Sequence, residues 1–98
     1  MDIATFKGSL AYEQPPEDLN GVLLALWLAS KGKWEEAHDL VQDDPGSDAA
    51  WVHAYLHRVE GDTFNARYWY QRAGKPAATS DLHEEWQNIS KALLQNKE

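Results

Sequence analysis

The sequence predicts an all-α fold made of two antiparallel helical hairpins and a C-terminal capping helix. Apolar residues recur at helical spacing in five segments of the chain. Glycine and proline interrupt the pattern between these segments, and the gaps are short, so consecutive helices are expected to run antiparallel. The 98 residues leave room for one domain, and a hydrophobic content of 43% with five tryptophans indicates a folded core.

The centre of the predicted core is the uncharged run 21–29, in the middle of a helix predicted over 16–31. Successive residues of a helix are rotated by about 100°, so the leucines of this run project in nearly opposite directions and leave no polar face. We therefore expect other helices to surround it, with Leu24 and Trp27 fully buried. A membrane span needs about 20 apolar residues, and this run is shorter, so we expect no membrane partner.

Residues 1–15 are predicted to form an N-terminal arm that ends at two prolines, and 16–44 the first hairpin. Its second helix is predicted over 34–43, after a turn closed by Gly32.

The second hairpin is predicted over 47–76, with helices at 48–60 and 63–73. Ser47 is expected to cap the first of them, Gly61 to close it, and Asp62 to cap the second. The acidic turn 43–48 lacks the alternating ligands and sixth-position glycine of an EF-hand, so it is not predicted to bind calcium.

A capping helix is predicted within 80–96, with its helical residues at 81–95 and Asp81 at its start. Four apolar residues of this helix share one narrow stripe, and we expect the stripe to cover the second face of helix 63–73, formed by Phe64 and Tyr68. The stripe consists of Leu82, Trp86, Ile89 and Leu93. We expect the stripe to pack within its own chain, so that the protein is a monomer. The alternative is that two chains exchange the stripe and form a dimer.

The second hairpin carries a pattern that resembles the tetratricopeptide repeat, a helical hairpin. The matching positions are Ala50, Trp51, Gly61, Asp62, Ala66, Tyr70 and Ala73. A shift of 29 residues also lays Gly32 on Gly61, Ala37 on Ala66 and Ala25 on Ala54. The first hairpin departs from the pattern at Trp34 and Asp44, and the offset is shorter than the family's spacing of about 34 residues, so the resemblance is to a divergent, short version.

This resemblance implies a non-catalytic scaffold that binds a protein or peptide, an inference by analogy. Residues 51–74 also look like a small family of uncharacterised proteins, which implies no activity.

The net charge of −7 disfavours nucleic acid and anionic lipid as partners. Residues 50–76 alone are basic, with four bases against two acids. The absence of cysteine excludes disulfides and thiolate sites, and the start of the sequence does not have the composition of a signal peptide. We expect a cytoplasmic protein.

Arginines and aromatic residues alternate in this basic stretch. Arginine binds carboxylates through paired hydrogen bonds, and aromatic side chains supply apolar contact area. We therefore expect a carboxylate-bearing ligand rather than single-stranded nucleic acid. The predicted ligand-binding residues are Arg58, Arg67, Arg72, Tyr68, His53 and His57.

His53, His57 and Glu60 are spaced so that they project from one arc of helix 48–60. A small metal- or acid/base-dependent enzyme, or a metalloprotein, built on them is the alternative hypothesis, with His38 or His83 as a further ligand. We favour instead hydrogen bonds from both histidines to neighbouring helices, with Glu60 solvated or paired with Arg58 or Arg67. The expectation is no metal and no cofactor.

No catalytic residues are predicted. The sequence contains no nucleophile elbow, no phosphate-binding glycine loop and no His-Glu-x-x-His run. The adjacent carboxylates Glu35 and Glu36, and Glu84 and Glu85, are expected on exposed faces, where they diverge and cannot flank a bond. We therefore expect no enzyme.

Overall fold

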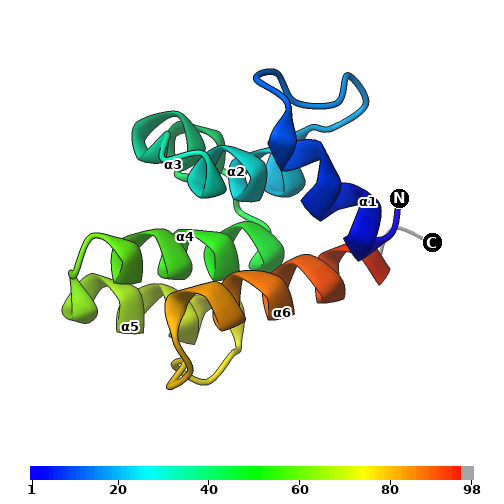
Figure 1. The fold of residues 1–98 in the computed structure, drawn as a ribbon. Coiled ribbons are helices and arrows are strands. Elements are labelled where there is room, and N and C mark those ends of the chain that lie inside the picture. The colour runs from blue at the N-terminus through cyan, green and yellow to red at the C-terminus, as the bar shows by residue number, and fades with distance from the viewer. Residues whose placement is uncertain (96–98) are drawn as a thin grey trace.

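The computed structural model describes residues 1–95, which form six α-helices and one short 3-10 helix and contain no strand (Figure 1). The elements are α1 (Ile3–Gly8), η1 (Ser9–Ala11), α2 (Gly21–Ser30), α3 (Trp34–Val41), α4 (Ser47–Val59), α5 (Thr63–Ala73) and α6 (Leu82–Gln95). Helix α2 packs against α3, and α4 against α5, while α6 lies along α4 and also contacts α2 and α1. The all-α class is confirmed. Within residues 1–95, every helix is too short or too polar to cross a bilayer.

Helix α2 lies at the centre of the core, as the uncharged run predicted. Leu26 and Trp27 are both fully buried, and α3, α4 and α6 all pack on this helix. The prediction that Leu24 is fully buried is wrong, because its side chain is only partly covered and packs at the edge of the core. The neighbouring helices therefore leave part of the α2 surface open.

The predicted start of this helix at residue 16 is also wrong, since α2 begins at Gly21. The backbone N–H of Leu19 donates to the carbonyl of Pro16 at 3.1 Å, which makes a turn after the prolines. Asn20 is extended, with φ −149° and ψ 172°, and precedes the first helical residue. Asparagine is among the residues preferred at this position, so the sequence did contain a signal for the observed start.

Residues 1–15 are not a separate arm, because α1 and η1 belong to the core. Phe6 is fully buried and stacks on Trp86 of α6, with ring centroids 5.5 Å apart. The indole Nε1 of Trp27 donates to the hydroxyl of Ser9 at 3.1 Å. These contacts join the N-terminal segment to α2 and α6.

Most predicted helix ends are confirmed to within one or two residues, and α5 has the predicted bounds. Gly32 and Gly61 take φ values of 78° and 84°, which other residues rarely adopt, and each lies in a short turn between two packed helices. Asp62 caps α5 by accepting the N–H of Asn65 at 3.1 Å. Ser47 is the first residue of α4 rather than its cap, a position that Gly46 occupies.

Helix α6 covers the core through three of the four predicted stripe residues. Trp86, Ile89 and Leu93 are buried, whereas Leu82 is 37% exposed. The predicted contact with Phe64 and Tyr68 is wrong, because these side chains are 83% and 47% exposed. The loop after α5 returns the chain so that α6 packs on α4, α2 and α1 (Figure 1). Residue 96 of the predicted capping segment lies outside the described residues.

A buried carboxylate attaches α6 to the second helix pair. Glu85 is only 3% exposed, so its predicted exposed position is wrong. Nη1 of Arg58 donates to Oε1 of Glu85 at 2.9 Å, and the hydroxyl of Tyr70 donates to Oε2. A buried carboxylate is tolerated only with such partners, and its two hydrogen bonds link α6 to both α4 and α5.

Candidate functional site: the histidine cluster

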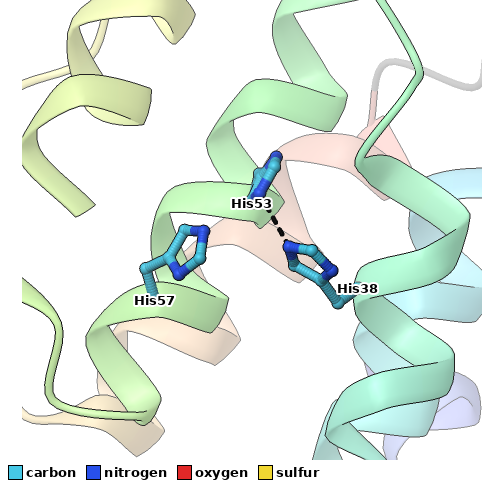
Figure 2. A group of neighbouring side chains, drawn as sticks. All are labelled: His38, His53 and His57. Carbon is cyan, nitrogen blue, oxygen red and sulfur yellow. Dashed lines mark hydrogen bonds between the residues drawn. The ribbon is translucent and has the colours of Figure 1, made fainter. Parts of the chain in front are cut away.

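Three of the four histidines of the chain converge beside α4, and we call them the histidine cluster (His38, His53 and His57). His53 and His57 lie one turn apart on α4, and His38 reaches them from α3 (Figure 2). The Nε2 atoms of His38 and His53 are 3.0 Å apart. One ring nitrogen from each histidine lies within 4.8 Å of the others.

The packing of α3 on α4 brings His38 to the cluster. Trp34, one turn before His38, donates its indole N–H to the carbonyl of Leu56 at 2.6 Å. The same indole stacks on the His38 ring, with centroids 4.7 Å apart and an interplanar angle of 11°. Trp34 therefore both attaches α3 to α4 and orients the imidazole of His38.

Burial disfavours the charged form of two of the three histidines, His53 and His38. His53 is 4% exposed, and one face of its ring stacks on Trp69 of α5 at 3.9 Å between centroids. Burial, reinforced by the neighbouring His38 and His57, lowers the pKa of His53 to about 4. Burial, and then the proximity of His57, also lowers the pKa of His38. Neutral imidazoles retain a lone pair, which a metal ligand requires.

Glu60 determines which nitrogen of His57 faces the cluster. Its Oε1 lies 2.6 Å from Nδ1 of His57, so the carboxylate accepts a hydrogen bond from that nitrogen. Nε2 of His57 is then the nitrogen left for the cluster, and Figure 2 shows the His57 ring directed toward His38 and His53. Glu60 was expected to be solvated or paired with Arg58 or Arg67. Its side chain is exposed, as the first alternative predicts, but within residues 1–95 its carboxylate contacts His57 and Arg58 pairs with Glu85, so the pairing with arginine is wrong.

The sequence offered His38 and His83 as candidates to join His53 and His57, and the structure places His38 beside them. His83 lies on α6, where its Nε2 is 2.9 Å from the side-chain amide of Gln87. Spacing along the chain placed His53, His57 and Glu60 on one arc, whereas the position of His38 depends on how α3 crosses α4. His57, Glu60 and Asp62 form a second close group of potential ligands, but Asp62 already caps α5.

The predicted ligand-binding residues are separated into three places. Arg58 is held by Glu85 and by the carbonyl of Ser80, close to α6. His53 and His57 belong to the histidine cluster. The remaining residues lie on the exposed side of α5, where the Arg72 guanidinium lies over the rings of Tyr68 and Trp69 at 5.9 and 5.5 Å, and Arg67 is exposed nearby.

Sequence reasoning missed Phe64 as a further exposed side chain of α5. Phe64 was predicted to be covered by the C-terminal helix, yet it is 83% exposed. Its spacing of four and eight residues from Tyr68 and Arg72 places all three on one stripe of α5. We call this stripe together with Arg67 the outer face of α5.

Comparison with models of protein families, with curated proteins and with solved structures finds no match to this chain. The tetratricopeptide resemblance therefore stays a prediction, and function is inferred from the residues themselves.

Proposed function

We propose that the chain is a non-catalytic protein-binding scaffold of the tetratricopeptide-like type, and that its ligand is a peptide segment that carries carboxylates beside an apolar side chain. The observation that carries the proposal is the outer face of α5, where a phenylalanine and a tyrosine are exposed next to two arginines. The packing of α2 on α3 and of α4 on α5 supports the tetratricopeptide-like arrangement of two hairpins.

The apolar part of the proposed ligand follows from the exposure of Phe64. A phenylalanine that is 83% exposed contributes almost nothing to the core. Aromatic side chains and arginine are enriched among the residues that dominate binding energy at protein interfaces. Phe64 and Tyr68 thus offer apolar contact area to a partner.

The carboxylates of the ligand follow from the charges on the same face. Within residues 1–95 the ion pairs are His57 with Glu60 and Arg58 with Glu85, so Arg67 and Arg72 have no acidic partner there. Nη1 of Arg72 donates only to the hydroxyl of Tyr68, at 3.2 Å. In a protein of net charge −7 these two exposed guanidinium groups give α5 a local positive charge that favours an acidic segment.

Selection from a library of random peptides displayed on phage tests the proposal. We expect the selected peptides to be enriched in Asp and Glu next to Phe, Leu or Trp. A synthetic copy of the strongest peptide should lose about 2 kcal/mol of binding free energy, roughly thirtyfold in Kd, on Phe64→Ala and on Arg72→Ala. Its affinity should also fall as salt is added.

Lys91→Ala is the matched control, because Lys91 is an exposed cation on α6, away from the outer face of α5. This variant should bind the peptide as tightly as the natural protein. Peptides without acidic enrichment, or peptides that bind Phe64→Ala and Arg72→Ala with unchanged affinity, would overturn the proposal.

A further inference from the structure

The chemistry of the histidine cluster points to a borderline transition-metal ion. Imidazole nitrogen is a preferred ligand of zinc, copper, nickel and cobalt, whereas magnesium and calcium prefer oxygen ligands. Zinc lies about 2.0–2.1 Å from histidine nitrogens, which in a tetrahedral site places neighbouring nitrogens roughly 3.3 Å apart. His38 and His53 are already at 3.0 Å, and all three ligand nitrogens lie within 4.8 Å. Small side-chain rotations would therefore complete the triangle.

The hydrogen bonding of the cluster brings two ring nitrogens together and is unfavourable for stability at His53. Two Nε2 atoms face each other at 3.0 Å, so one must carry a proton to donate to the other. Nδ1 of His53 is buried, and within the described residues it has no hydrogen-bond partner. Buried polar atoms normally find partners. An apolar side chain at residue 53 would avoid this loss, so stability alone does not explain an imidazole there.

The surroundings of His57 match those of a metal ligand. Histidine ligands usually donate their second ring N–H to a carboxylate or carbonyl, which fixes the tautomer and the ring orientation. Glu60 provides this contact for His57 at 2.6 Å. Trp34 and Trp69 stack on His38 and His53 and hold the planes of these rings.

We infer that His38, His53 and His57 bind one zinc-class divalent ion through their ring nitrogens, with Glu60 as a positioning residue for His57. Three protein ligands leave the fourth tetrahedral position open to water or to a carboxylate. His38 is partly exposed, which gives an ion a route to the cluster. This inference reverses the expectation of no metal, because the sequence could not show that α3 delivers a third imidazole. It does not depend on the proposed peptide ligand.

Calorimetric titration of the tag-free full chain with zinc chloride is the first test, and the visible absorption of bound cobalt(II) reports the geometry. We expect one ion per chain and the intense absorption of tetrahedral cobalt. His38→Gln and His57→Gln should abolish this binding. Glu60→Gln should weaken it by about tenfold to hundredfold, as removal of a carboxylate that orients a ligand does.

His83→Gln is the matched control, because it removes the one histidine outside the cluster. It should leave stoichiometry and affinity unchanged. Circular dichroism checks that each variant is folded, and His38→Gln is the safest ligand variant because this side chain is the least buried of the three. No saturable binding, or saturable binding that survives in folded His38→Gln, overturns the inference. Binding that survives there but falls in Asp62→Asn would place the ion at His57, Glu60 and Asp62 instead.

Discussion

Replacement of Trp86 by alanine should remove a large part of the stability of this protein. Trp86 is 3% exposed and stacks on Phe6, and its Nε1 donates to the carbonyl of Leu26 at 2.8 Å. It therefore connects α6 to both α1 and α2. The substitution removes the stacking, the hydrogen bond and the apolar contact area at once.

The size of the effect follows from this burial. A tryptophan buries about 150–250 Å², which at about 25 cal/mol per Å² corresponds to roughly 4–6 kcal/mol. Measured losses for such truncations are about 3–5 kcal/mol. A domain of this size has a total stability of roughly 5–15 kcal/mol. We therefore expect Trp86→Ala to lose about 4 kcal/mol.

Urea unfolding followed by circular dichroism measures this loss, with light scattering to follow the molar mass. The stability of Trp86→Phe should lie between those of the natural protein and Trp86→Ala. This variant keeps an aromatic ring beside Phe6 but loses the hydrogen bond from the indole to the carbonyl of Leu26, a net loss of about 0.5–1.5 kcal/mol. Phe64→Ala is the control and should change stability by less than about 0.5 kcal/mol. A Trp86→Ala protein as stable as the natural one, or a natural protein that is a dimer and becomes a folded monomer on this substitution, would refute the intrachain role of α6.

Two further predictions concern the core and the histidine cluster. Leu26→Asp should prevent folding, because an unpaired buried carboxylate costs several kcal/mol. Leu24→Asp should leave a folded protein of lower Tm, since the side chain of Leu24 is partly exposed. Equal thermal melts of the two variants would contradict this ranking. Burial lowers the pKa of His53 from 6.5 in the unfolded chain to about 4 in the folded protein. The unfolded state therefore binds more protons between pH 4 and 6.5, and the free energy of unfolding falls as pH drops from 6.5 to 4. In metal-free buffer, His53→Leu should remove up to about 3 kcal/mol of that fall, and parallel pH profiles of stability for the two proteins would contradict it.

The helices could be predicted from the sequence because their signals are local. Apolar spacing and the residues at the ends set the bounds of α5, and Gly32 and Gly61 marked the turns. Ile3, Phe6 and Leu10 have a weak helical spacing, but the sequence did not show that this segment joins the core. Helix α1 has only six residues, and its stability comes from the burial of Phe6 against Trp86. Tertiary packing of this kind is not visible in a short stretch of sequence.

The candidate site could be predicted only in part for the same reason. His53, His57 and Glu60 share one helix, so their spacing placed them together. The third histidine depends on the contact between Trp34 and Leu56, which holds α3 on α4. The positions of Phe64 and Glu85 likewise depend on which helix α6 covers, and helical periodicity does not specify the partner of an apolar stripe.

Nitrogen-15 NMR of the histidine rings, recorded with and without one equivalent of zinc, tests the histidine cluster most directly. The chain has four histidines, so every ring can be followed separately. Zinc should shift the ligand nitrogens of His38, His53 and His57 together, with Nε2 as the metal-bound atom of His57, and leave the ring of His83 unchanged. Shifts confined to His83, similar small shifts in all four rings, or no shift at all would contradict the account.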